Sequence, residues 1–435
     1  MINKSNTLLS YPFIILYLIL LVILLSNLIE PYIHIYTSIL IIITILIFFI
    51  PEFSYAFYIT DGLLLSTYFF VFKVDSISIL PTMILFLLFG ILLSNNYFYN
   101  FFKDKQNRNI ILIAFFLGLY ILIRSFNGVG GDYGYIKSYS YFLRNFVFLM
   151  IPILFFYSDL SLKKIHYAGV IISIIIIFLS LLNYLQLDYA SERLDPTGRH
   201  NVIWFGRAMA LSIVWFYYTI VSNSKYVVKI ISIIMIVLAM FLLNVTGSRG
   251  PLLSLVLSFL LFIFFTKKYG FKTKFVLLGF ISILIIPGFT YLFTNIMNRF
   301  TSLSTDVSAL IRIYAIYHGI LLFFQKPFFG WGTGSFASIV NEFIKYPHNI
   351  FVELSMETGI IGLILFILFL VIVIYNMIAL RKKIVEKSHS DLLNLSFLIF
   401  FLAFFNSQLS GDIAHNPLMW FSAGCVLVLR KILTN

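Results

Sequence analysis

The amino-acid sequence predicts an all-α membrane protein with about 12 to 14 transmembrane helices, because its apolar runs are many and long enough to cross a bilayer. Of the 435 residues, 61% are hydrophobic, and the mean hydropathy is +1.01. The apolar runs are continuous, whereas the strands of a transmembrane barrel would alternate apolar and polar residues. We therefore expect one integral membrane domain over residues 1–435, with no separate soluble domain.

Each predicted span is an apolar run of roughly 17 to 25 residues. The first run is too long for the core of a signal peptide and lacks a small-residue cleavage site, so we expect it to be a retained helix. The second and third runs are short, and the region around Pro51 and Asp61 would form either two spans or one broken helix. The candidate spans in chain order are 8–28, 34–50, 55–72, 77–95, 109–125, 140–157, 167–187, 202–222, 228–245, 251–266, 274–295, 349–379, 392–408 and 416–433.

The basic residues divide between the two sides of the membrane. Eighteen of the 30 lysines and arginines, 15 of them lysines, occupy alternate loops and the chain termini, which is typical of cytoplasmic segments. The other 12 comprise 8 arginines and 4 lysines and fall on the outer side. Arginine is preferred where a planar fork binds phosphate or carboxylate, so this excess predicts an outward anionic ligand. The alternative is contact with lipid headgroups and scattered salt bridges. The net charge of +13 indicates anionic lipid and membrane topology, and no nucleic-acid partner is expected.

Two arginines, Arg249 and Arg312, are predicted to lie near the outward N-termini of helices. Ser248 suits an N-cap, and Pro251 suits the first turn of the helix that follows. A helix N-terminus offers free N–H groups and a positive dipole end, and a neighbouring arginine completes a phosphate site. The alternative for both arginines is an interfacial side chain whose charged end reaches water.

His348 is the candidate general base. Pro347 keeps the preceding residue extended, so His348 or Asn349 should open the next span. A helix N-terminus and nearby arginines disfavour the imidazolium, and a neutral imidazole is what a general base requires. A structural histidine is the alternative, and the histidines that compete for the role are His200, His318 and His415.

Asn349, Glu353 and Glu357 are spaced by four residues and therefore share one helix face. Carboxylates near the outer third of a span are costly and are functional candidates. They would orient His348 or pair with Arg312; a structural ion pair is the alternative.

Three further outward segments carry weaker signals. Residues 193–207, which include Arg199 and Arg207, could line a rim that binds sugar. The glycines of Gly330–Gly334 predict a tight turn after the helix that carries Arg312. The stretch Gly128–Asp132 is predicted to be a flexible loop that could act as a lid.

These residues resemble the O-antigen ligase and O-antigen polymerase superfamily of integral-membrane glycosyltransferases. The resemblance covers roughly residues 200–420, and His348 and Gly359 satisfy the H-x10-G pattern of the ligases. The stretches that carry it are Gly247-Ser-Arg-Gly250, Arg312 within Leu310-Ile-Arg-Ile-Tyr, Gly330-Trp-Gly-Thr-Gly-Ser-Phe336, Tyr346-Pro-His-Asn-Ile-Phe-Val-Glu353 and Glu357-Thr-Gly359 with Gly362.

The resemblance implies a donor glycan on undecaprenyl pyrophosphate in the outer leaflet of a bacterial inner membrane. A glycan hydroxyl would attack the anomeric carbon with inversion, and the lipid pyrophosphate would leave. Carried over, Arg249 and Arg312 bind the pyrophosphate and His348 is the base. The substrate-binding set that we predict beside them is Arg199, Arg207, Asn349, Glu353 and Glu357.

The same resemblance places the active site outside the membrane. Residues 200–420 would form the catalytic region, and an extracytoplasmic loop with short helices, 296–348, would carry part of the active site. The outward segments have no cluster with credible metal-ligand spacing, so neither a metal nor any other cofactor is expected.

The main interpretation is a polymerase that joins lipid-linked repeat units into O-antigen or capsular polysaccharide. A chain-length regulator is then a further expected partner. The alternative is a ligase that transfers the glycan to lipid A-core or another acceptor. A flippase or transporter is the third interpretation, but it predicts paired repeats and charged residues in mid-membrane, and Asp61 is the one such charge before the catalytic region.

The lysine distribution makes the topology testable. Both termini and the loop that contains Lys272 should be cytoplasmic, and His348 should be outside, because lysine-rich loops stay on the inner side. Reporter fusions after Lys272 and after His348 should give opposite signals. External reporter activity after Lys272 would contradict the outward active site.

Overall fold

The structure, a computed structural model, describes residues 104–155, 159–186, 202–223, 225–266, 307–340 and 344–434. The four spans predicted before residue 100, the span 274–295, the Pro51–Asp61 question and Arg199 lie outside the described residues. The helices of the described part are α7 Lys105–Phe126, α8 Gly131–Ser140, α9 Val147–Phe155, α10 Asp159–Gln186, α11 Val202–Ser222, α12 Tyr226–Val245, α13 Arg249–Phe265, α16 Val307–Gln325, α17 Ser335–Ile339, α18 Ile350–Lys383, α19 Lys387–Leu409 and α20 Pro417–Thr434. A π-helical segment, η3 Tyr141–Phe146, joins α8 to α9, and a 3-10 turn, η4 Ile413–His415, precedes α20.

The prediction of an all-α polytopic membrane protein is confirmed. Seven described helices are long and apolar enough to cross a membrane, and six of them match predicted spans. The seventh is α16, which the sequence analysis placed in an extracytoplasmic loop of short helices. It is 19 residues long, so the expectation of short helices in this segment does not hold for α16.

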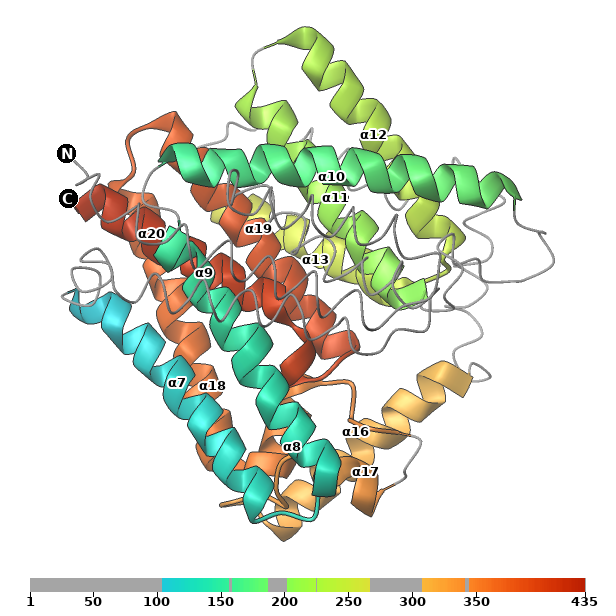
Figure 1. The fold of residues 1–435 in the computed structure, drawn as a ribbon, viewed down its shortest axis with the longest axis vertical. Coiled ribbons are helices and arrows are strands. Elements are labelled where there is room, and N and C mark those ends of the chain that lie inside the picture. Colours follow the sequence, from blue (N-terminus) through green and yellow to red (C-terminus); the bar gives the residue numbers. More distant parts are fainter. Residues whose placement is uncertain are drawn as a thin grey trace, which may run out of the picture.

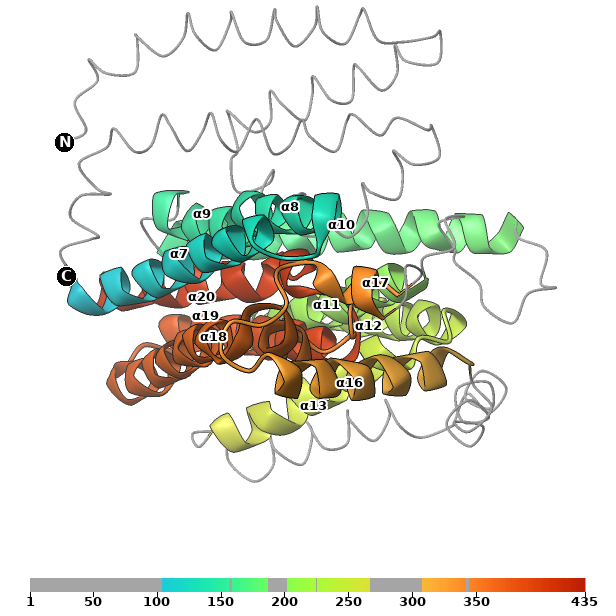
Figure 2. The same ribbon diagram turned by 90° about the horizontal axis from the view of Figure 1, so that it is seen from below.

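The helices pack in layers around α20. Figure 2 shows α7 to α10 in one layer, α11 and α18 to α20 in the next, and α13 with α16 beyond them. Trp420 of α20 is fully buried between Tyr141 and Phe369, with ring centroids 5.3 Å and 4.2 Å away. Aromatic contacts of this kind join η3, α18 and α20 into one core.

Helix α18 is broken at Gly359, whose φ of 68° and ψ of −166° are not helical. The loop after α16 fills the break: the N–H groups of Trp331 and Gly332 donate to the carbonyls of Met356 and Glu357 at 2.9 Å and 2.8 Å. Beyond the break, the Ile360 N–H donates to the Pro327 carbonyl at 2.8 Å. The loop thus replaces the backbone hydrogen bonds that the interrupted helix loses, as a membrane interior requires.

Glycines make this close contact possible. A Cβ on Gly359 would lie 2.2 Å from the Phe328 carbonyl oxygen, and one on Gly330 would lie 2.5 Å from the Glu357 carbonyl carbon. A second contact follows next to it, where a Cβ on Gly128 would lie 2.4 Å from the Cα of Gly332. The loop predicted to be a flexible lid is therefore packed backbone to backbone against the Gly330–Gly334 turn, and the lid prediction is wrong. In Figure 1 the connection between α7 and α8 lies beside α17, which directly follows the Gly330–Gly334 turn.

Replacing Gly359 by alanine should destabilise the protein by about 3 kcal/mol or more, because the new Cβ meets a backbone oxygen and the dihedral angles favour glycine. Thermal unfolding in detergent measures the effect. Gly131→Ala is the matched control, since Gly131 also has a positive φ of 52° but has open space within 4 Å of the position that a Cβ would take. A fall in Tm for Gly359→Ala no larger than that for Gly131→Ala would contradict the tight contact.

Candidate functional site

Four of the predicted site residues, Arg207, Arg249, His348 and Asn349, lie close to helix ends that meet one another. The Ser248 hydroxyl, before α13, donates to the Val202 carbonyl at the start of α11 at 3.0 Å. The Asn349 side-chain amide, before α18, donates to the Gln408 carbonyl near the end of α19 at 3.4 Å. In Figure 1 the C-terminal end of α19 and the start of α18 lie together near the middle of the molecule. The N-termini of α11, α13 and α18 and the C-terminus of α19 thus belong to one end of the bundle.

His348 directly precedes the helix α18. Its φ is 58°, and among the described residues it is the one non-glycine residue with a positive φ. Asn349 is the N-cap, and its side-chain oxygen accepts from the N–H groups of Phe351 and Val352 at 3.1 Å and 3.2 Å. The prediction that His348 or Asn349 opens this span is confirmed. A strained residue held next to a well-formed cap is typical of functional sites.

The pKa of His348 is lowered to about 4, first by burial and then by the charges of Arg312 and Arg207, whereas Asp412 raises it. Its Nδ1 is buried and has no hydrogen-bond partner among the described residues. The Tyr346 ring lies edge-on at 4.7 Å between centroids. The imidazole is therefore neutral, as predicted, although burial contributes more to this than the helix terminus that the sequence suggested.

Arg207 lies in the second turn of α11 and is 6% exposed. Its Nη2 donates to the carbonyls of Ser410 at 2.6 Å and Asn406 at 3.3 Å, and its guanidinium lies 4.8 Å from the Trp204 ring. These carbonyls close the C-terminal end of α19, where a cation is favourable. Arg207 thus ties α11 to α19 beside His348, and its contact with substrate stays a prediction.

The other two arginines lie in the first two turns of α13 and α16, as the sequence suggested, and the side of the membrane that they face stays a prediction. Arg312 is half-buried on α16 and is close enough to His348 to lower its pKa. Arg249 is half-buried and is the first residue of α13. Ser248 occupies the N-cap position, but its hydroxyl does not cap the helix and instead binds α11. Arg249 therefore lies beside the start of the helix that carries Arg207.

The two carboxylates of α18 have a partner that the sequence analysis missed. The Lys137 Nζ lies 2.5 Å from Glu353 Oε1 and 2.7 Å from Glu357 Oε1, and all three side chains are at most 2% exposed. The structure thus pairs these carboxylates with Lys137, which fits the alternative of a structural ion pair and not the expected contacts with Arg312 or His348. In the sequence, Lys137 precedes Glu353 by 216 positions and Glu357 by 220 positions, so no local pattern could predict this pairing.

Asp412 is a second residue that the sequence analysis missed. It is buried, and one of its carboxylate oxygens accepts a hydrogen bond from the Tyr133 hydroxyl at 3.1 Å. The next residue, Ile413, is held at both backbone groups: its N–H donates to Glu353 at 3.1 Å, and its carbonyl accepts from the Asn145 side chain. An acidic residue after Ser410-Gly411, just before an apolar helix, was the signal in the sequence.

Two comparisons with known proteins found similar sequences. Residues 234–367 match the sequence model of the family described as O-antigen ligase. A protein of Rickettsia conorii named "Putative polysaccharide ligase" is 27% identical over 308 residues, which cover 64% of this chain and 69% of that protein.

Both matches support the O-antigen ligase and polymerase superfamily, which the sequence motifs resemble. The matched region contains Arg249, Arg312 and His348. An O-antigen ligase-type function, that of a glycosyltransferase-like enzyme in a multi-pass membrane setting, is therefore supported.

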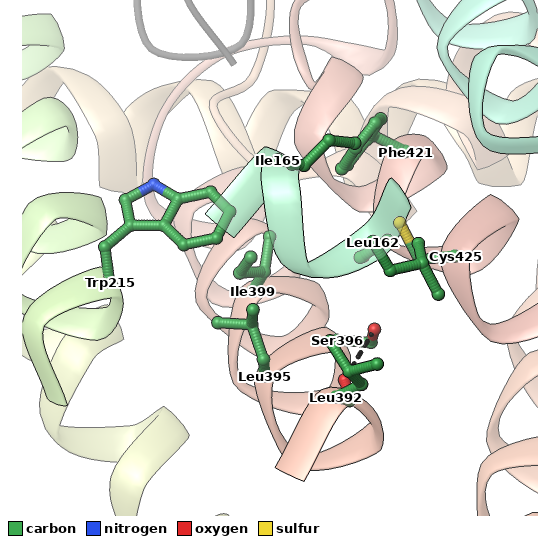
Figure 3. Close-up of a pocket in the computed structure, with 10 residues that line it drawn as sticks. Leu162, Ile165, Trp215, Leu392, Leu395, Ser396, Ile399, Phe421 and Cys425 are labelled. Carbon is green, nitrogen blue, oxygen red and sulfur yellow. Dashed lines mark hydrogen bonds between the residues drawn. The ribbon is translucent and has the colours of Figure 1, made fainter. Parts of the chain in front are cut away.

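Elsewhere in the bundle, a cavity lies between α10, α11, α19 and α20 (Figure 3). Its lining is mainly apolar and includes Trp215, Ile399, Phe421 and Cys425, and none of the predicted site residues lines it. Within the described ranges, no group of three His, Cys, Asp or Glu residues could hold a metal ion. The expectation that transfer needs no metal stays a prediction.

The lowered pKa predicts how His348 titrates. In the folded protein the imidazole should stay neutral until about pH 4, instead of its ordinary 6.5. Since the unfolded chain binds this proton first, this histidine makes the fold less stable as the pH falls from 6.5 towards 4. NMR of protein labelled with ¹⁵N-histidine, with His348→Gln to assign the signal, measures the titration. In Arg312→Gln the pKa should rise but stay below 6.5, because burial is the larger cause. A wild-type midpoint near 6.5 would contradict the buried, cation-flanked site.

Proposed function

We propose that the chain transfers a glycan from undecaprenyl pyrophosphate to a hydroxyl acceptor, on the outer face of a bacterial inner membrane. The observation that carries this proposal is the placement of His348, which is neutral, strained and flanked by Arg312 and Arg207. The similarity to the O-antigen ligase family supports the substrate class, a lipid-linked glycan. The catalytic region is residues 200–420, and the segment 296–348 contributes from the outer side.

In this mechanism, His348 removes the proton of the acceptor hydroxyl while the oxygen attacks the anomeric carbon. A new carbon–oxygen bond forms, the bond from that carbon to the pyrophosphate oxygen breaks, and the pyrophosphate leaves with the electron pair. The configuration at the anomeric carbon inverts. General base catalysis of this kind typically contributes a hundred- to ten-thousand-fold in rate.

In this mechanism the arginines bind and stabilise the leaving group. Arg312 and Arg249 bind the pyrophosphate, with the N-terminus of α13 adding free N–H groups. The bound anion also offsets the positive charge that lowers the pKa of His348, so the imidazole becomes more basic once the donor is in place. Asp412, which already raises that pKa, then stabilises the imidazolium that forms. The guanidinium groups do the work of a divalent cation, so this mechanism needs no metal.

The acceptor distinguishes two candidate functions. We infer a polymerase, in which the acceptor is another lipid-linked repeat unit, from the isoleucine-, phenylalanine- and tyrosine-rich sequence and the Gly330-Trp331-Gly332 turn. The names of the matched family and of the Rickettsia protein favour the second candidate, a ligase that uses lipid A-core or another acceptor. In either case Arg199 and Asn349 are proposed to contact the glycan.

Purified enzyme given only lipid-linked repeat units should produce a ladder of longer glycans that remain on pyrophosphate lipid, since a polymerase needs no other acceptor. Gel analysis of the labelled glycans measures it. His348→Ala should reduce the ladder by about a hundredfold or more, with donor binding retained at the arginines. His318→Ala, which changes another half-buried histidine, on α16, is the matched control and should leave the ladder intact.

Two different results would contradict the two parts of this proposal, the polymerase activity and the role of His348. No ladder from wild type, but transfer when a core lipid is added, would replace the polymerase by the ligase. A ladder that persists in His348→Ala would remove His348 as the base.

A further inference from the structure

A buried ion cluster lies beside the proposed active site, and none of its residues takes part in the proposed bond-making or proton transfer. It consists of Lys137 on α8 and the two carboxylates of Glu353 and Glu357 on α18. The Lys137 Nζ lies 2.5 Å from Glu353 and 2.7 Å and 2.8 Å from the two oxygens of Glu357. Lys137 is 1% exposed, so the charges interact with little screening by water.

One member of this cluster also holds the loop 410–413, which begins two residues after the Gln408 carbonyl that Asn349 binds. Both oxygens of Glu353 accept from the Ile413 N–H, at 3.2 Å and 3.1 Å. Ile413 follows Asp412, which raises the pKa of His348, and the nearby carbonyl of Ser410 accepts from Arg207. The contacts therefore run from Lys137 through Glu353 to the loop 410–413.

Helix α8 and the segment that follows it contact the loop 410–413 through two further hydrogen bonds. Tyr133, one turn before Lys137, donates to Asp412 at 3.1 Å. Asn145, in the π-helical segment that follows α8, donates to the Ile413 carbonyl. The loop is thus held from one continuous helical stretch and from α18, and Lys137 joins the two.

We propose that Lys137 is a positioning residue for glycosyl transfer: through Glu353 it fixes the loop 410–413, and thereby the places of Asp412 beside His348 and of Arg207. This inference rests on the proposed function. Without the lysine, two buried carboxylates would face each other, and one would take a proton to avoid the repulsion. A protonated or displaced Glu353 would hold the Ile413 N–H less well, and the loop would no longer place Asp412 against the imidazole.

Glu357 provides a built-in comparison. Both glutamates contact Lys137, both are buried, and they are one helical turn apart. They differ in their contact with the loop, because it is Glu353 that accepts from the Ile413 N–H. A purely structural ion cluster predicts similar effects from either glutamate, whereas positioning predicts that Glu353 matters more for turnover.

The test compares Glu353→Gln with Glu357→Gln in the full-length protein. For each variant we would measure the Tm in detergent, the KM for the lipid-linked donor, and kcat at saturating donor. We expect Glu353→Gln to lower kcat roughly tenfold with little change in KM, the typical effect of losing one charge-assisted hydrogen bond. Glu357→Gln should lower kcat clearly less at an equal or larger fall in Tm.

Lys137→Met alone leaves the carboxylates unpaired, so it should reduce the amount of folded protein. The triple variant Lys137→Met, Glu353→Gln, Glu357→Gln removes every charge of the cluster and should restore folding, while kcat stays reduced roughly tenfold or more. Lys225→Met, which removes an exposed lysine before α12, should change neither Tm nor kcat.

Equal kcat losses for the two glutamine variants, or wild-type kcat in the triple variant, would overturn the positioning role and leave a structural one. These outcomes differ from failure of the proposed function, in which the wild-type protein itself would transfer no glycan from lipid-linked donor to any hydroxyl acceptor supplied.

Discussion

The break in helix α18 is the constraint on which the site depends. A helix interrupted within a membrane protein must find other partners for its free backbone groups, and here the loop after α16 supplies them. That loop fixes the C-terminal end of α16 at Gly359, so α16 runs back along the first turns of α18. A Cβ on Gly319 of α16 would lie 2.5 Å from Val352. About three helical turns separate the break from His348, and this distance brings Arg312 close enough to lower the pKa of the histidine.

At this end of the bundle, the arginines and the buried carboxylates occupy different places. Arginines lie near His348, where an anion would bind, while the carboxylates of Glu353 and Glu357 are turned away toward Lys137. Asp412 interacts electrostatically with both groups, since its charge acts on His348 and on the lysine cluster. The carboxylates can thus support the site without repelling the pyrophosphate that we propose as its ligand. A buried cluster that keeps its negative charge compensated is compatible with an anion site only a few residues away.

The sequence predicted those features of the site that depend on interactions between neighbouring residues, such as the start of a helix. Pro347 and Asn349 mark the start of α18, and their effects are confined to one turn, so the placement of His348 could be anticipated. The helices themselves follow from uninterrupted apolar runs. Contacts across the fold could not be anticipated in this way. The partner of Glu353, the role of Asp412 and the carbonyls bound by Arg207 all depend on how distant helices pack. Ser248 shows the same limit: its position as an N-cap follows from the sequence, but its hydroxyl binds α11.

The π-helical segment Tyr141–Phe146 sets the rotational phase of one helix relative to the next. A π-turn accommodates one residue more than an α-turn, and each residue of a helix rotates the following side chains by about 100°. Before this segment, Lys137 points at α18; after it, the Leu149 carbonyl and Pro152 lie against Gly424 of α20. Loss of a single residue here would leave an ordinary helix of the same composition, yet it would turn either the lysine or the packing face away from its partner. Chain length in this stretch is therefore as constrained as residue identity.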